Sequence, residues 1–247
     1  MNRKHTISVA FLGRTEYREC WDLQKTLFDR RLRGSIDDTL LITEHDPVYT
    51  LGRGGNPHHL LVPLDELAAM GATFVMTDRG GDITYHGPGQ LVAYPIVDLN
   101  DYGRDLHQYL RRLEEVVIRV LEQYEVNGRR QNGWTGVWVE EEKICAIGVK
   151  TSRWVTMHGL AMNVSTDLSW FDTIVPCGIV DKKVTSLSAV TGMKVTPDEI
   201  IPAFLQEFGE VFDATMIGQP GELPPPHMNA AAVGLRDNEL MGSHGED

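Results

Sequence analysis

The longest periodic pattern of apolar residues in the chain predicts an amphipathic helix from Leu106 to Tyr124. Apolar side chains recur there at about every 3.6 residues, and Asp105 stands where the N-terminal cap of a helix belongs. The stripe consists of Leu106, Leu110, Leu113, Val117, Val120, Leu121 and Tyr124.

Three further segments carry helix signals. Thr15 to Arg33 has apolar residues near helical spacing, and Leu64 to Met70 stops at Gly71. The run Thr196-Pro197-Asp198-Glu199 combines a capping box with proline at the first helical position, which predicts a helix that ends near Phe212.

Short apolar or alternating runs between these helices predict strands. A turn at Asp46-Pro47 separates two of them, and the acidic tip Glu140-Glu141-Glu142 joins two others into a hairpin. Because strands come in hairpin-like pairs rather than in a regular βαβ series, we expect an α+β fold, a mixed β-sheet with flanking helices. The expected strands are Thr6–Leu12, Thr39–Glu44, Val48–Leu51, Ala72–Met76, Thr135–Val139, Lys143–Val149 and Val155–Val164.

Charge and composition narrow the class of protein. The net charge of −12 argues against nucleic-acid binding, which needs a basic face. Arg30-Arg31-Leu32-Arg33 and Asp181-Lys182-Lys183 are local basic runs that an acidic partner could use, although solvated helix ends and loops are the commoner explanation. No apolar stretch approaches the roughly 20 residues of a membrane span, and no signal or transit peptide is recognisable. We therefore expect a cytoplasmic protein that does not bind membranes.

The three cysteines are Cys20, Cys145 and Cys177, and their spacing fits neither a disulfide framework nor a zinc site. Cys20 lies beside Trp21 in the pattern of its helix, so packing explains it. Cys177 lies in an irregular segment between a proline and a glycine, and irregular segments carry functional residues more often than helices and strands do. A reactive thiol and an inert one both fit this position.

The densest concentration of glycine and polar residues runs from Arg79 to Gln90, with the sequence RGGDITYHGPGQ. Glycine lets a backbone approach a ligand closely and adopt positive φ. The segment is not a phosphate-binding P-loop, because it lacks Gly-Lys-Ser/Thr and no helix start follows it. A ligand-binding loop and a simple turn between strands are both consistent with this composition.

A nucleophilic thiol needs a neighbouring base or cation, because a free cysteine is mostly protonated at neutral pH. The candidate rings are His86 and His158, and the candidate cations are Lys143, Lys150 and Lys182. Lys143 opens an apolar strand, where partial burial would lower its pKa. A lysine that protects a hairpin edge against strand pairing is an equally common alternative.

In this order, the motifs resemble those of the lipoyl(octanoyl) transferases, the octanoyl-acyl-carrier-protein:protein N-octanoyltransferases. The resemblance extends from about Trp21 to Phe212. It rests on the runs Arg79–Gln90, Lys143–Gly148, His158–Asn163, Val175–Ile179 and Val184–Leu187.

The resemblance implies a fold like that of the lipoate ligases and the biotin protein ligase catalytic core. We expect residues 1–217 to form a single octanoyltransferase catalytic domain and the Pro-rich residues 218–247 to form a poorly ordered tail. Cys177 is the implied thioester-forming nucleophile and Lys143 its partner. Cys145 stands where alanine is usual, two residues from Lys143 and on the same expected strand face. The implied substrate-binding residues are Arg79, Gly80, Gly81, Asp82, Ile83, Thr84, Tyr85, His86, Ala146, Ile147, Gly148, Gly159, Leu160 and Ala161.

The implied reaction transfers octanoyl from octanoyl-acyl carrier protein to Cys177, and then to a lysine of a lipoyl domain or of glycine-cleavage H protein. Lipoyl-acyl carrier protein is a second donor, the lipoyl domains are those of 2-oxoacid dehydrogenase E2 subunits, and we expect a monomer without cofactor or metal. Three alternatives are an ATP-dependent lipoate- or biotin-type ligase, a non-catalytic carrier-binding module, and a thioesterase that pairs Cys177 with His86 or His158.

Overall fold

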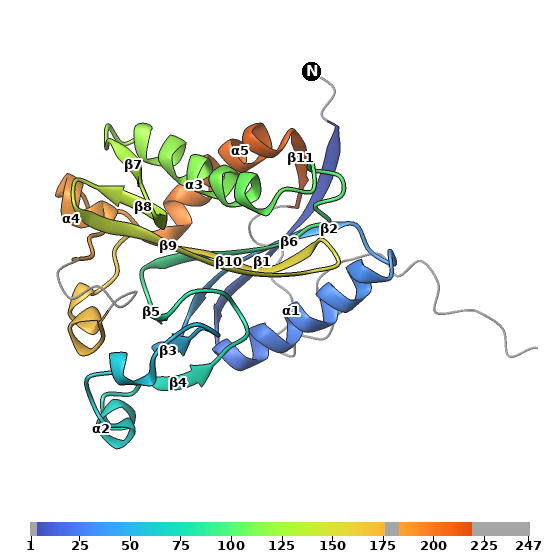
Figure 1. The fold of residues 1–247 in the computed structure, drawn as a ribbon. Helices are drawn as coiled ribbons and strands as arrows, with labels where there is room; N and C mark the ends of the chain where they lie inside the picture. The colour runs from blue at the N-terminus through green and yellow to red at the C-terminus, as the bar shows by residue number, and fades with distance from the viewer. Residues whose placement is uncertain (1–3, 176–182, 219–247) are drawn as a thin grey trace, which may run out of the picture.

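The computed structural model describes residues 4–175 and 183–218, and its centre is an eight-stranded mixed β-sheet (Figure 1). The strand order is β11-β1-β2-β6-β10-β9-β8-β7. β1 runs parallel to both of its neighbours, and the other neighbouring strands are antiparallel. The strands are β1 His5–Thr15, β2 Asp38–His45, β6 Gln90–Ile96, β7 Gly128–Gln131, β8 Trp134–Val139, β9 Glu142–Ser152, β10 Val155–Asn163 and β11 Ala214–Ile217.

A smaller sheet lies below the large one in Figure 1, with the order β4-β3-β5. β3 (Val48–Leu51) pairs in parallel with β4 (Thr73–Met76) and antiparallel with β5 (Ile83–His86). Its apolar cluster packs against the short 3-10 helix η2, Leu168–Thr173. The short helices η1 (Pro57–His59) and α2 (Leu64–Ala69) lie in the connection between β3 and β4.

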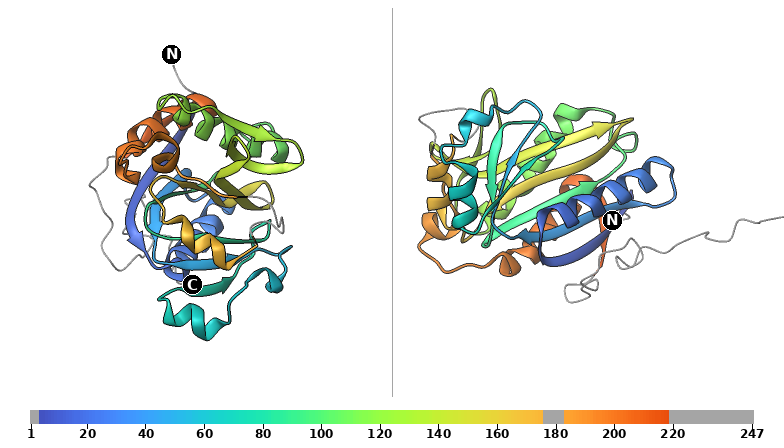
Figure 2. Two further views of the ribbon diagram at one scale, coloured as in Figure 1. Left: turned by 90° about the vertical axis from the view of Figure 1, so that its left-hand side faces the viewer. Right: turned by 90° about the horizontal axis from the view of Figure 1, so that it is seen from below.

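Helices cover both faces of the large sheet. α3 (Leu106–Glu122) and α5 (Pro197–Phe212) pack on one face, and α1 (Tyr17–Leu32) packs on the other (Figures 1 and 2). The apolar residues of α3 and α5 share one buried cluster with β1, β2 and β10, and those of α1 share a second cluster with the opposite faces of the same strands. Of the stripe that predicted α3, Leu113, Val117, Val120 and Leu121 are buried in the first of these clusters.

The predicted α+β fold is confirmed, as are the predicted caps. The Asp105 side chain accepts a hydrogen bond from the Gln108 backbone N–H, and Thr196 and Glu199 form the capping box of α5. Within the glycine-rich segment the expectation of a loop is wrong for Ile83–His86, which is the strand β5. The strands β7 and β11 and the short helix α4 (Leu187–Thr191) were not expected from the pattern either.

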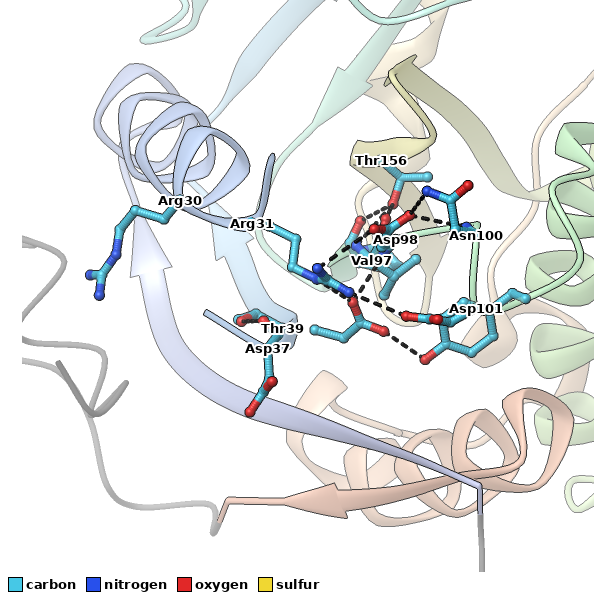
Figure 3. Close-up of polar contacts among 12 residues, drawn as sticks. Arg30, Arg31, Asp37, Thr39, Val97, Asp98, Asn100, Asp101 and Thr156 are labelled. Carbon is cyan, nitrogen blue, oxygen red and sulfur yellow. Dashed lines mark hydrogen bonds and ion pairs between the residues drawn. The ribbon is translucent and has the colours of Figure 1, made fainter. Parts of the chain in front are cut away.

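The basic run at the end of α1 is partly a structural ion pair. The Arg31 guanidinium lies 2.8 Å from Asp38 Oδ1, 3.4 Å from Asp101 and 3.6 Å from Asp98 (Figure 3). Arg31 therefore ties the C-terminus of α1 to β2 and to the loop after β6. Of the second run, Asp181 and Lys182 lie outside the described residues.

Candidate functional site

A cavity of about 540 Å³ lies between the large sheet and the glycine-rich segment, a volume typical of small-molecule sites. β9 and β10 line one side of it, and the residues that precede and form β5 line the other. The N-terminal turns of α3 and the start of β8 contribute Leu106, Leu110, Trp134 and Thr135. Apolar side chains from separate elements therefore surround much of the space.

Small residues make up the floor of this cavity. Ala146 on β9 is paired with Ala161 on β10, and Gly148 is paired with Gly159, so these residues share one face of the sheet. A Cβ atom added at Gly148 would lie 2.8 Å from the Gly80 carbonyl oxygen, closer than van der Waals contact allows. The sheet and the glycine-rich segment thus approach each other as closely as glycine permits.

The glycine-rich wall is fixed by Arg79 and Gly80. The buried Arg79 guanidinium donates to the Thr50 carbonyl oxygen (2.6 Å) and to Thr50 Oγ1 (2.9 Å). The Gly80 backbone N–H donates to the Val149 carbonyl oxygen over 2.9 Å. β8 pairs with β9 only as far as Cys145. Beyond Cys145, Gly80 forms a hydrogen bond with the edge of β9 that β8 leaves unpaired.

Lys143 also lines the cavity, and its backbone has a partner on both sides. It is paired with Trp138 of β8, and it forms a parallel bridge with Val184. The Lys143 ammonium lies 4.7 Å from the centre of the Trp138 ring. The alternative of an edge-protecting lysine is therefore wrong, because this part of β9 is not an edge.

The sequence predicted that Lys143 and Cys145 lie on the same face of their strand, and this prediction is wrong. The pairing shifts by one residue between Val137 and Trp138, so Ile144 and Cys145 both join the core cluster under α3. Burial raises the pKa of the Cys145 thiol, which is fully buried. Cys145 and Cys20 are therefore packed side chains.

Three buried histidines lie at and behind the cavity. Burial lowers the pKa of His45 to about 4, and it lowers the pKa of His86 well below the usual value. Burial also lowers the pKa of His158, whose Nε2 lies 2.7 Å from Asp78 Oδ1. The hydrogen bond from His158 and the ammonium of Lys150 hold the pKa of Asp78 well below its usual range. The histidines are therefore neutral at pH 7.

Nearly all the described residues that the resemblance implied for substrate binding lie around this one cavity. The exception is Tyr85, whose ring stacks on Trp170 at 5.2 Å between centroids and packs in the small-sheet cluster. The predicted residues that line the cavity are Arg79, Gly80, Gly81, Asp82, Ile83, Thr84, His86, Ala146, Ile147, Gly148, Gly159, Leu160, Ala161 and the predicted catalytic residue Lys143. Their roles in binding and catalysis stay predictions.

Cys177 lies outside the described residues. The residues on either side of its segment are anchored near the cavity. The Val175 N–H donates to the His59 carbonyl oxygen over 2.8 Å, and the Lys183 carbonyl oxygen accepts from the Lys143 N–H over 2.9 Å.

Sequence reasoning missed several residues that line the cavity. Tyr17 and Tyr94 are buried beside His45 and His86, and pattern alone gives no sign that they meet. Leu106 and Trp134 remain partly exposed although they are large and apolar, and that unusual exposure marks them once the fold is known.

The described part of the chain, residues 4–175 and 183–218, lacks two features. No cluster of three or more histidine, cysteine, aspartate or glutamate side chains within it could hold a metal ion. Among its helices, none combines the length and the apolar character needed to cross a membrane.

Comparison with known proteins agrees with this geometry. Residues 16–209 match the family described as lipoyl protein ligase A/B catalytic domain. An octanoyltransferase of Chloroflexus aurantiacus is 52% identical over 210 residues, which cover 84% of this chain and 94% of the relative. An octanoyltransferase of Flavobacterium psychrophilum is 47% identical over 229 residues, covering 86% of this chain and 99% of the relative.

Two solved structures share the fold. A lipoate-protein ligase A bound with ATP has a TM-score of 0.71 at 17% identity, covering 87% of this chain and 90% of that chain. A bi-partite lipoate protein ligase from Thermoplasma acidophilum has a TM-score of 0.68 at 19% identity, covering 87% of each chain. With the family match spanning most of the sequence and relatives near half identity, the chain belongs to the lipoyl protein ligase A/B catalytic domain family and is an acyltransferase of its octanoyltransferase branch.

Proposed function

We propose that this protein transfers an octanoyl group from octanoyl-acyl carrier protein to a lysine of a lipoyl domain or of glycine-cleavage H protein, through a thioester on Cys177. The observation that carries the proposal is the cavity itself. Apolar side chains surround much of it, its floor is alanine and glycine, and Lys143 lines it. A saturated acyl chain needs such a space, and the reacting thioester needs a cation beside it.

The backbone contacts of Lys143 support its pairing with Cys177. Lys183 is the first described residue after the segment that carries Cys177, and its carbonyl oxygen accepts a hydrogen bond from the Lys143 N–H. An ammonium near a thiol favours the thiolate, which is the nucleophilic form.

The reaction then has two steps. The Cys177 thiolate attacks the thioester carbonyl carbon, the bond from that carbon to the sulfur of the carrier's pantetheine breaks, and the released thiolate takes a proton from Lys143. The ε-amine of the acceptor lysine next attacks the Cys177 thioester. Neutral Lys143 takes a proton from that amine, the carbon–sulfur bond breaks, and an amide and the Cys177 thiolate result.

The neutral side chains around the cavity suit an uncharged acyl chain. Leu110, Ile147 and Leu160 supply apolar surface, and burial keeps His86 and His158 uncharged. An eight-carbon saturated tail would therefore leave water and contact this apolar surface. Lipoyl-acyl carrier protein, whose eight-carbon acyl chain ends in a dithiolane ring, is a second donor under this proposal.

The main alternative is an ATP-dependent ligase, because the fold is shared with a lipoate-protein ligase A bound with ATP. A ligase would activate free octanoate as an adenylate and would not need Cys177. The thioester donor makes ATP unnecessary, since it already carries an activated acyl group.

Intact mass spectrometry after mixing with octanoyl-acyl carrier protein tests the proposal. We expect the enzyme to gain the mass of one octanoyl group, the Cys177→Ala variant to gain none, and the matched thiol control Cys145→Ala to gain it as the wild type does. The proposal is wrong if Cys177→Ala keeps both the adduct and full turnover, or if acyl transfer to an acceptor domain requires free octanoate and ATP.

A further inference from the structure

A chain of buried hydrogen bonds runs from the glycine-rich wall to the backbone beside Lys143. Thr50 Oγ1 accepts from Arg79 at 2.9 Å and lies 3.3 Å from His86 Nε2. His86 Nδ1 lies 3.0 Å from Gln90 Oε1, and Gln90 Nε2 donates to Asn163 Oδ1 over 2.9 Å.

The chain continues to the strand that holds Lys143. Asn163 Nδ2 donates to the Thr185 carbonyl oxygen over 3.0 Å. The Thr185 N–H donates to the Lys143 carbonyl oxygen over 3.0 Å. The side chains that form this chain, Thr50, Arg79, His86, Gln90 and Asn163, are all buried, as is Thr185.

Each link in this chain has one allowed direction. Arg79 can only donate, so Thr50 Oγ1 accepts from it and is free to donate its own proton to His86 Nε2. Gln90 Oε1 can only accept, which places the proton of the neutral ring on His86 Nδ1. The amide N–H groups of Gln90 and Asn163 then point onward, so the donors all run from Arg79 toward Thr185.

Asn163 lies where the strand paired with β9 changes from β10 to the segment around Val184. The register of β10 with β9 ends at Met162 and Cys145, and two residues earlier on β9 the neighbour is Val184 instead. Asn163, the last residue of β10, joins the two with its side-chain amide. Residues 183–185 are held to β9 by the bonds at Lys143 and to β10 by Asn163.

We propose that Asn163 is a positioning residue for Lys143. Its amide fixes Thr185, and Thr185 fixes the Lys143 backbone so that the ammonium stays where the reaction needs it. The inference rests on the proposed function, because Lys143 is the proton carrier there. Gln90 orients the Asn163 amide, and the neutral His86 orients Gln90.

The test replaces Asn163 and compares it with a residue of equal burial on the same strand. Asn163→Asp keeps the size but puts an acceptor oxygen against the Thr185 carbonyl, and Asn163→Ala removes the group. The matched control is Thr156→Val, because Thr156 is fully buried on β10 and bonds the Pro95 carbonyl, away from Lys143. Steady-state kcat and KM for octanoyl-acyl carrier protein, acyl-enzyme formation and thermal stability are measured for all three.

We expect kcat for Asn163→Asp to fall by about 100-fold, the effect of a displacement of about 1 Å in a catalytic group, with KM for the donor unchanged. As pH is lowered, its rate relative to wild type should recover, because the protonated carboxyl again donates to Thr185. Asn163→Ala should show no such recovery. Thr156→Val should lose stability and keep its kcat.

The inference is overturned if folded Asn163→Asp keeps the wild-type kcat, or if Thr156→Val loses kcat as much as Asn163→Asp does. Absence of any adduct on the wild-type enzyme would contradict the proposed function instead. In that case the pH dependence of the rate at which iodoacetamide alkylates Cys177 still tests whether Asn163 positions Lys143. The inference requires Asn163→Asp to shift it to higher pH and is overturned if the profile does not move.

Discussion

At the scale of single residues, burial decides which side chains around the cavity carry charge. His45 is fully buried, with Nε2 2.7 Å from the Tyr94 hydroxyl and Nδ1 3.1 Å from Thr15 Oγ1. Its neutral ring satisfies both partners, and a protonated ring would place a charge in the interior. Burial lowers the pKa of His86 and His158 too, although the Asp78 carboxylate acts in the opposite direction on His158.

The first prediction concerns the pH dependence of stability. Burial lowers the pKa of His45 from 6.5 to about 4 in the folded protein, so the unfolded chain binds the proton first as pH falls. The contribution of His45 to the free energy of unfolding is therefore complete above the unfolded pKa and is lost as pH falls toward the folded pKa. The loss amounts to about 3 kcal/mol at most.

Urea unfolding at pH 7 and pH 5 measures this loss. We expect His45→Gln to have a smaller difference between the two pH values than the wild type, although His86 and His158 will preserve part of it. The exposed His107 on α3 provides the control, and His107→Gln should follow the wild type. A His45→Gln curve parallel to that of the wild type would contradict the assignment.

At the scale of elements, the close approach of β9 to the glycine-rich segment bounds the cavity that is proposed to hold the acyl chain. A methyl group at Gly148 would lie 2.8 Å from the Gly80 carbonyl oxygen and 3.3 Å from Arg79 Cδ. The wall would have to move, and the Gly80 bond to Val149 would weaken with it.

We therefore expect Gly148→Ala to raise KM for octanoyl donors by about tenfold, in line with the cost of overpacking a close contact. Butanoyl donors, which fill less of the cavity, should be affected less in the same variant. Steady-state kinetics with both thioesters measures the difference. An equal effect on the two donors would show that Gly148 does not border the acyl chain.

The elements also show what a single sequence can and cannot predict. α3 and α5 were predictable because a periodic stripe and a cap are local signals. β5 was missed because glycines surround a strand of only Ile83–His86, whose alternation is too short to detect. β7 was missed because its sequence, GRRQ, has no apolar face. Its place in the sheet depends on its pairing with β8.

The same limit applies to the cavity. The motif residues on β9 and β10 could be predicted from resemblance, and the structure brings them together through the pairs Ala146–Ala161 and Gly148–Gly159. Tyr85 faces away because β5 alternates, with Thr84 and His86 toward the cavity. The role of Asn163 depends on the register of β10 and on Val184, neither of which the sequence pattern contains.

At the scale of the whole molecule, the two sheets hold different sides of the cavity. The large sheet, with α1 on one face and α3 and α5 on the other, supplies a rigid floor and holds Lys143 (Figure 1). The small sheet holds the glycine-rich wall through Thr50 and Arg79. The fold is shared with lipoate ligases, and the proposed difference lies in the chemistry, since a thioester donor replaces ATP.

The most direct test of this account follows the acyl group itself. Enzyme that has been octanoylated from its carrier donor is separated from that donor and mixed with a lipoyl domain, in the absence of ATP. We predict that the octanoyl mass leaves Cys177 and appears on a lysine of the lipoyl domain within a single turnover. Release of free octanoate without transfer, or a lipoyl domain that gains octanoyl only when free octanoate and ATP are supplied, would contradict it.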